Sequence, residues 1–136
     1  EPAIRVGVPY DDMGAAVRFL TGVLGMHVLK MWGPEDSPMF AYLAHRDSVM
    51  SIAVRPPRDN PWSTVGPVSV GLTEPDEEAL TQTYQRAVEA GCEILRELGT
   101  HQNPAVPDGY LGFVLRDFEG NLWSMESRTW TTGAER

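Results

Sequence analysis

Cysteine is nearly absent from this sequence, with Cys92 alone among 136 residues. A single cysteine excludes a disulfide within the sequence, so the fold must be held together by its hydrophobic core. Chains without a disulfide framework are typical of reducing compartments. We therefore expect a cytoplasmic protein.

Long apolar runs are also missing. No stretch approaches the roughly 18 consecutive apolar residues that mark a membrane-spanning helix, and the residues from Glu1 onward lack the basic-then-apolar order of a secretion signal. This pattern predicts no membrane partner. The hydrophobic fraction of 42% is instead that of an ordinary globular chain.

Basic charge is scarce. Lysine and arginine number 11 against 19 aspartates and glutamates, for a net charge of −8. The arginines are scattered, whereas a protein that binds nucleic acid needs a basic surface against the phosphates. We expect no nucleic-acid partner. The acidic balance is compatible with cationic ligands, although solubility is its ordinary consequence.

The apolar residues follow a pattern that occurs twice. In the first half, alternation through Ile4, Val6 and Val8 predicts a strand. Asp11 or Asp12 can then cap an amphipathic helix that Gly25 ends. Three further strands are expected over residues 26–32, 39–44 and 48–54.

The second half repeats this order, with a strand over residues 68–72, a cap at Asp76 and a helix-ending Gly91. A strand over 92–97, a Gly/Asn/Pro loop over 98–108 and a closing hairpin should follow. The hairpin strands are 110–116 and 122–126, and the turn between them contains Gly120 and Asn121. We infer an internal duplication.

We expect one domain, 1–136, with module 1 over about 3–55, a Pro-rich linker over 56–66, module 2 over about 67–128 and a tail over 129–136. Each module is one strand, one helix and three strands. One helix covers only one face of a four-stranded sheet, so the other face needs a partner. The predicted class is α+β, with two βαβββ modules whose sheets form a cup and whose helices lie on the outer faces. The modules pair either within one chain or across a dimer.

Two motifs carry a resemblance to a known family. Residues 8–25 read V-P-Y-D-D-M-G-A-A-V-R-F-L-T-G-V-L-G, and residues 116–123 read R-D-F-E-G-N-L-W. Together they resemble the glyoxalase/bleomycin-resistance/dioxygenase superfamily, also called vicinal oxygen chelate proteins, over nearly the whole chain. The resemblance implies a homodimer with a ligand site between two modules. Some members are metal enzymes, and others bind a drug without converting it.

Strand alternation assigns side chains to the two faces of each sheet. The first helix is expected to cover Ile4, Val6 and Val8, which turns Arg5 and Gly7 into the cup. Phe40, Tyr42, Ser69 and Gly71 also point inward by alternation, and the family's register adds Leu122, Ser124 and Glu126.

Metal-dependent relatives carry His or Glu at such positions, where this sequence has Arg5, the Pro67/Ser69 region, Phe40 and Ser124. A catalytic metal needs about three nitrogen or oxygen ligands. We therefore expect neither a metal nor another cofactor.

The expected ligand site is an aromatic pocket with a few polar groups, the usual composition of a small-molecule site. Aromatic side chains stack on planar rings and attract cations, while Arg5 or Glu126 would set the preferred ligand charge. The predicted ligand-binding residues are Arg5, Phe40, Tyr42, Trp62, Ser69, His101, Tyr110, Ser124 and Glu126.

The resemblance and this residue set favour a bleomycin-resistance-type protein that sequesters an aromatic or cationic antibiotic-like ligand and catalyses nothing. One alternative is a metal-dependent glyoxalase-like lyase, isomerase or dioxygenase that uses other ligands, such as His101 and Glu126. Another is a non-catalytic interaction or sensor domain that binds a second protein through the Pro-rich linker.

Overall fold

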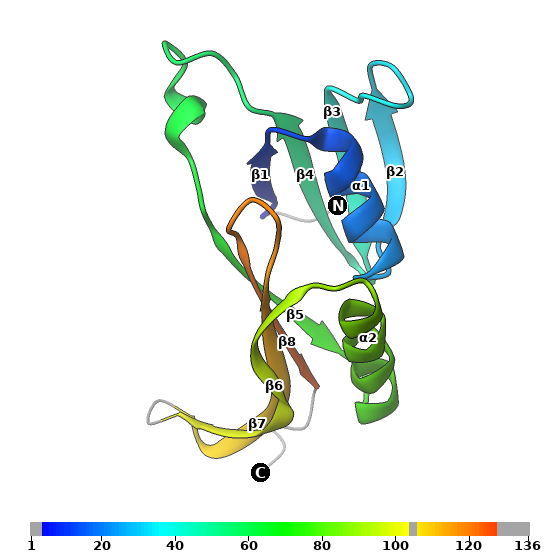
Figure 1. Ribbon diagram of the computed structural model, residues 1–136, viewed down its shortest axis with the longest axis vertical. Helices are drawn as coiled ribbons and strands as arrows, with labels where there is room; N and C mark the ends of the chain where they lie inside the picture. The colour runs from blue at the N-terminus through cyan, green and yellow to red at the C-terminus, as the bar shows by residue number, and fades with distance from the viewer. Residues whose placement is uncertain (1–3, 104–105, 128–136) are drawn as a thin grey trace. The chain divides into compact units, whose positions relative to one another are not determined.

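The computed structural model describes residues 4–103 and 106–127, with the side chains of residues 101–110 outside the described part. The chain divides into two compact units at Val68/Ser69. Unit 1 contains β1 (Val6–Tyr10), α1 (Met13–Gly22), β2 (His27–Trp32), β3 (Phe40–His45) and β4 (Ser48–Val54), followed by the short 3₁₀ helix η1 (Pro61–Thr64) (Figure 1).

Unit 2 repeats the order of one strand, one helix and three strands. It contains β5 (Ser69–Glu74), α2 (Glu77–Glu89), β6 (Glu93–Asn103), β7 (Val106–Arg116) and β8 (Leu122–Ser127). The predicted βαβββ duplication is therefore confirmed.

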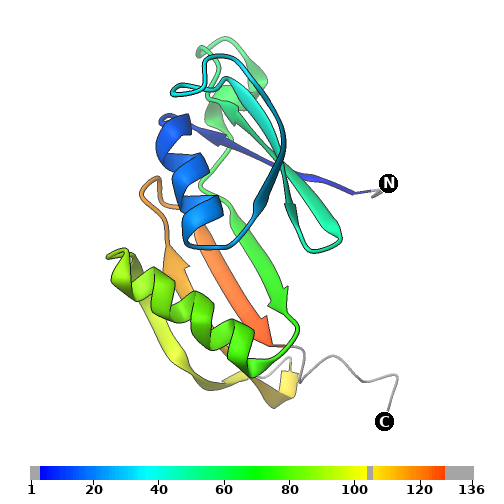
Figure 2. The same ribbon diagram turned by 90° about the vertical axis from the view of Figure 1, so that its right-hand side faces the viewer.

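Each unit forms one mixed four-stranded sheet. The strand orders are β1-β4-β3-β2 and β5-β8-β7-β6. The first strand of each unit runs parallel to the last, and the remaining pairs are antiparallel. In each unit the helix lies on one face of its own sheet (Figures 1 and 2). This arrangement is the predicted α+β class.

The helix ends follow the sequence signals. Asp12 accepts a hydrogen bond from the Ala15 N–H at 3.0 Å, and Asp76 accepts one from the Ala79 N–H at 2.8 Å, so both predicted caps are confirmed. After α2, Gly91 has a φ of +76°. The Cys92 N–H then donates to the Ala87 carbonyl at 3.0 Å, which closes the helix in a Schellman motif.

The core lies between each helix and its sheet. In unit 1 the fully buried side chains include Leu20 of α1, Leu43 of β3 and Ile52 of β4. The expectation for β1 was partly wrong, because Ile4 and Val6 are 84% and 42% exposed, and Val8 is buried. The ten-residue α1 covers only the end of β1 that leads into it, and the amino end of β1 extends away from the helix (Figure 2).

The R-D-x-x-G-N-x-W motif builds the turn between β7 and β8. The buried Asp117 carboxylate accepts hydrogen bonds from the Glu119 and Asn121 N–H groups at 2.9 and 3.0 Å. Its other oxygen accepts from Asn121 Nδ2 and Trp123 Nε1, both at 3.0 Å. Because Trp123 is completely buried, this carboxylate satisfies an indole N–H that water cannot reach. The motif is therefore structural.

The loop predicted over residues 98–108 was wrong. Residues 93–103 and 106–116 instead form two long strands that pair through Gly99↔Gly112 and His101↔Tyr110. The pairing of these two strands is irregular, with register shifts between Arg96 and Gly99 and between His101 and Asn103.

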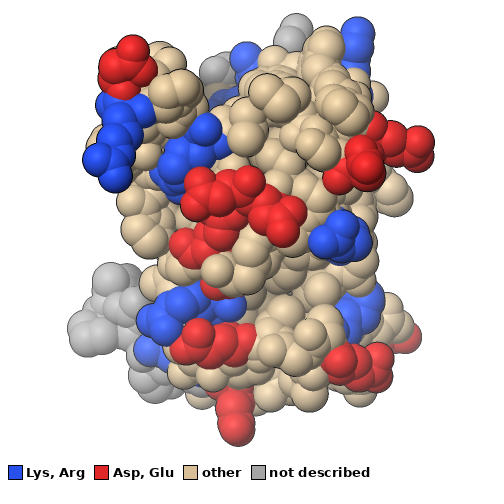
Figure 3. All heavy atoms as spheres, turned by 45° about the horizontal axis from the view of Figure 1, so that its top comes forward, with Lys and Arg blue, Asp and Glu red and all other residues tan. Residues whose placement is uncertain are grey.

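The surface carries both signs of charge. On the face shown in Figure 3, acidic and basic side chains alternate with uncharged ones. Within the described residues, no helix is both long enough and apolar enough to span a bilayer.

Candidate functional site

The candidate site lies on the sheet face of unit 1 opposite α1, which we call the open face. Burial alternates along β3, where Ala41 and Leu43 are fully buried and Phe40 and Tyr42 are partly exposed. Phe40 and Tyr42 therefore lie on the open face, as strand alternation predicted.

Register places two rows of residues across this face. One row is Gly7↔Ser51↔Tyr42↔Lys30, and the next is Pro9↔Ala53↔Phe40↔Trp32. In both rows the positions on β1 and β4 hold small side chains, and those on β3 and β2 hold large ones. This distribution leaves a hollow over β1 and β4, beside the large side chains of β3 and β2.

The segment after β4 forms a wall of this hollow. Arg55 anchors it, since its Nη1 donates to the Ser63 and Val65 carbonyls at 3.1 and 2.8 Å, and its Nε donates to Asp11 at 3.0 Å. Asn60 caps η1 by accepting the Trp62 N–H at 2.9 Å. The predicted linker thus folds back on unit 1 and holds Trp62 in place, although that side chain is 64% exposed.

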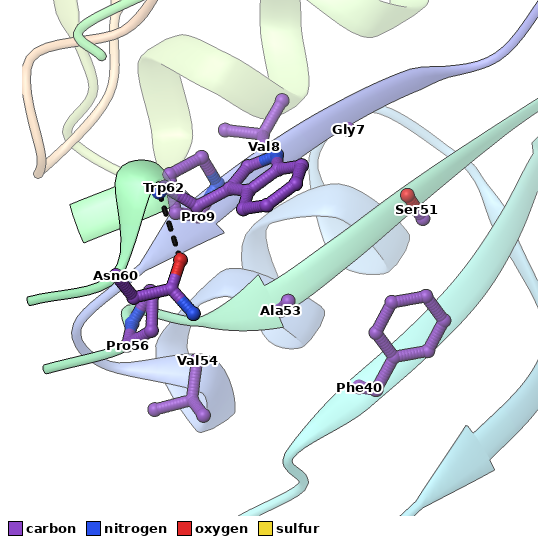
Figure 4. A pocket seen from close by; sticks show the side chains of 10 residues that line it. All are labelled: Gly7, Val8, Pro9, Phe40, Ser51, Ala53, Val54, Pro56, Asn60 and Trp62. Atoms are coloured by element: carbon purple, nitrogen blue, oxygen red, sulfur yellow. Dashed lines mark hydrogen bonds between the residues drawn. The ribbon is translucent and has the colours of Figure 1, made fainter. Parts of the chain in front are cut away.

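The resulting pocket has a volume of about 330 Å³, which is within the range of small-molecule sites. Trp62 lies beside Pro9 and across the pocket from Phe40, and Ser51 and Ala53 lie between them (Figure 4). The lining consists of apolar side chains, glycine, Ser51 and Asn60. None of these residues has a titratable side chain.

Three aromatic side chains, Trp32, Phe40 and Tyr42, form a cluster that we call the aromatic ridge. Their ring centroids are 5.1 to 5.6 Å apart, and all three pairs meet edge to face, an arrangement that aromatic quadrupoles favour. The Arg5 guanidinium carbon lies 5.0 Å from the Tyr42 ring centroid, and Lys30 Nζ lies 5.1 Å from that of Trp32. Two cations therefore flank the ridge.

The predicted site residues separate into two groups. Phe40 and Trp62 line the unit 1 pocket, and Tyr42 and Arg5 adjoin it. Three others lie on the sheet of unit 2 at consecutive register rows, since Ser69 pairs with Leu122, Gly71 with Ser124, and Thr73 with Glu126. His101 and Tyr110 pair through their backbones, and their side chains lie outside the described part.

Several residues that shape the unit 1 site were absent from the predicted set. Lys30 lies one row from Trp32, and both belong to β2, for which the sequence predicted a strand over residues 26–32 without assigning its faces. Gly7 had been assigned to the cup without a role, and it now forms part of the pocket wall. Ser51 and Asn60 had no distinctive sequence signal, because their importance depends on which residues lie across from them.

The donor groups of the site do not fit a divalent metal. Arg5 is itself a cation placed over Tyr42, and Phe40 belongs to the ridge. Among the side chains that the structure describes, those of residues 4–100 and 111–127, no three histidine, cysteine, aspartate or glutamate side chains converge as metal ligands do. The alternative pair of His101 and Glu126 stays a prediction.

Cys92 lies outside this site, after α2, and is partly exposed. Burial raises the pKa of its thiol above the ordinary value, and the nearby Asp117 carboxylate raises that pKa further. A nucleophilic cysteine needs the opposite shift, so Cys92 is poorly suited to catalysis.

The fold is shared with several solved structures. TioX from Micromonospora sp. ML1 superposes with a TM-score of 0.72 at 20% identity, covering 93% of this chain and 98% of TioX. Lactoylglutathione lyase from Agrobacterium tumefaciens superposes with a TM-score of 0.69 at 15% identity, covering 98% of this chain and 97% of the lyase. At these identities the likeness establishes the fold alone, and function must be argued from the residues.

The curated proteins contain no sequence that matches this chain. A family model does match, over residues 4–125, and describes the Glyoxalase/Bleomycin resistance protein/Dioxygenase superfamily. That match spans both βαβββ units and both motifs on which the resemblance depended. The chain therefore belongs to the glyoxalase/bleomycin-resistance/dioxygenase superfamily.

Proposed function

We propose that this protein binds a small aromatic molecule in the unit 1 pocket and holds it without metal and without chemical conversion, as a bleomycin-resistance-type protein does. The observation that carries this proposal is the lining of the pocket. It offers two aromatic walls, Phe40 and Trp62, and no titratable side chain. General acid–base catalysis requires a titratable group within hydrogen-bond reach of the substrate.

Binding alone needs only affinity. Phe40 and Trp62 on opposite sides of the pocket suit a planar ring, which can stack on one side chain and meet the edge of the other. Ser51 and the Asn60 side chain supply the few polar groups that orient such a ligand. The Ser51 hydroxyl has no base among the lining residues, so nothing there activates it as a nucleophile.

We further propose that the protein acts as a cytoplasmic homodimer. Superfamily members often bind small ligands and form dimers. Sedimentation equilibrium checks this point, since a monomer at micromolar concentration would overturn the dimer and leave the unit 1 pocket as proposed.

The test of binding is a titration of the purified protein with a panel of aromatic antibiotics, followed by intrinsic tryptophan fluorescence. We expect dose-dependent, saturable quenching, because Trp62 and Trp32 are both partly exposed at the site. Trp62→Phe should remove much of the quenching and keep most of the affinity. Recovery of every ligand unchanged after incubation supports holding without conversion. A flat fluorescence response together with no binding heat would overturn the proposal.

Dialysis against a chelator separates this proposal from the metal-dependent alternative. We expect unchanged affinity after chelation, since the pocket lining contains no histidine, cysteine, aspartate or glutamate. Affinity or turnover that is lost with EDTA and restored by a divalent cation would favour a metal-dependent enzyme.

A further inference from the structure

The open face of unit 1 carries cations and no carboxylates. In the two register rows that cross it, the only charged side chain is Lys30. Arg5 lies two residues before Gly7 and reaches Tyr42 of the same face. This composition contrasts with the chain as a whole, which has a net charge of −8.

From this contrast we infer that the ligand of the unit 1 site is a planar aromatic anion, with its ring in the pocket and its carboxylate, sulfonate or phosphate held by Arg5 and Lys30. This inference rests on the proposed binding function and adds the charge of the ligand. A cationic ligand, which the sequence had left open, would meet two like charges at the ridge.

Each cation is held in place by a ring. Arg5 lies over Tyr42 and Lys30 lies over Trp32 at about equal distances, 5.0 and 5.1 Å. A cation over an aromatic face keeps N–H donors available at its periphery. Both side chains are exposed, and no carboxylate in the described residues pairs with either of them. An anion can therefore approach without first displacing an ion-pair partner.

The spacing of the site sets the dimensions of the ligand. Gly7 lines the pocket, and Arg5, immediately before β1, lies two residues earlier and reaches Tyr42 of the same face. Two residues of extended strand span roughly 7 Å, so the anionic group should lie about one fused-ring length from the ring centre. A naphthalene ring with a directly attached carboxylate has these dimensions.

Three matched probes test the inference by isothermal titration calorimetry: 2-naphthoate, 2-naphthalenemethanol and 2-naphthylmethylammonium. They share one ring system and differ in charge. We expect naphthoate to bind about tenfold more tightly than the alcohol in 50 mM salt, and the ammonium to bind most weakly. The preference should shrink in 500 mM salt, because screening weakens exposed charge pairs.

Two double variants test whether Arg5 and Lys30 cause the preference for naphthoate over the alcohol. Arg5→Gln combined with Lys30→Gln should reduce the naphthoate preference to about twofold or less and leave affinity for the alcohol nearly unchanged. The control is Arg18→Gln combined with Arg46→Gln, which removes the same charge from an exposed position on α1 and from an exposed position in the turn between β3 and β4. That control should keep the preference.

The outcomes separate the two proposals. If all three probes bind equally, or the ammonium binds best, the charge inference fails and aromatic binding stands. The inference also fails if the naphthoate preference persists in the Arg5/Lys30 double variant. If no probe binds, the proposed function fails and the inference fails with it.

Discussion

The open faces of the two sheets have the same topology and very different side chains. In unit 1, adjacent rows contain Phe40 beside Trp32 and Tyr42 beside Lys30, next to small residues on β1 and β4. In unit 2, the three rows that begin at Ser69, Gly71 and Thr73 contain no aromatic side chain. A duplicated framework therefore positions a pocket and aromatic ridge in one copy and glycines with mostly polar, non-aromatic side chains in the other.

Unit 2 instead contains a buried carboxylate, that of Asp117 under the β7–β8 turn, which accepts several hydrogen bonds. The R-D-x-x-G-N-x-W motif therefore stabilises a turn, whereas Phe40, Ser51 and Trp62 of the pocket belong to neither motif. Changes to Asp117 should affect stability, and changes around Phe40 and Trp62 should affect binding.

The largest expected effect is on the stability of unit 2. Asp117→Ala would leave the buried Trp123 indole N–H and the turn N–H groups without their acceptor, at a cost of about 3 kcal/mol in the free energy of unfolding. Urea denaturation measures this loss. The matched control is Glu93→Ala, which removes a carboxylate from the exposed 2.8 Å ion pair with Arg116 and should cost less than about 1 kcal/mol. Equal losses of stability in Asp117→Ala and Glu93→Ala would show that the hydrogen bonds of Asp117 stabilise the fold no more than an exposed ion pair does.

A side chain at Gly7 should close the unit 1 pocket. A Cβ added there would lie 3.2 Å from the Ser51 hydroxyl oxygen, and the methyl groups of Gly7→Val would project into the pocket. We expect more than about a tenfold loss of naphthalenemethanol affinity by calorimetry. The strand should tolerate valine, so the thermal midpoint should change little.

The control for Gly7→Val is Gly22→Ala, whose added Cβ meets no atom within 4 Å. It should leave affinity unchanged. Full affinity in Gly7→Val would place the ligand elsewhere and remove the contrast between the two open faces.

A moderate effect is expected at Trp62. Its side chain is 64% exposed, so Trp62→Ala should change the free energy of unfolding by less than about 0.5 kcal/mol. Loss of one stacking wall should nevertheless weaken naphthalenemethanol binding by about 1 kcal/mol, or roughly fivefold in Kd. A large loss of stability with unchanged affinity would make Trp62 a packing residue.

The smallest effect concerns Cys92. Its raised pKa keeps the thiol protonated at neutral pH, so iodoacetamide should alkylate the folded protein more slowly than the urea-unfolded chain at pH 8. The folded pKa lies above the unfolded one, so the associated stability is present below the unfolded pKa and declines as pH rises through the folded value. Mass spectrometry of timed samples measures the alkylation rate. Faster reaction in the folded state would contradict the burial argument.

Local signals in the sequence predicted most of the secondary structure. Asp12, Asp76 and Gly91 act at helix ends as expected, because capping depends on residues only a few positions apart. The prediction failed at residues 98–108, where glycine and proline suggested a loop and pairing between β6 and β7 produced long strands. It also failed at Ile4 and Val6, because the reach of a helix over a strand depends on the angle at which they pack.

The sequence by itself determined the duplicated βαβββ units, the family, and the face on which Phe40 and Tyr42 lie, since period-two alternation and helix caps are local properties of the chain. Only the tertiary structure decided that the Pro-rich segment folds back as a wall, that Gly7 and Ser51 leave space beside Phe40, and that Lys30 joins Arg5 at the ridge. The physical reason is that strand register and the Arg55 anchor bring together residues distant in sequence, and a pocket is a property of such neighbours.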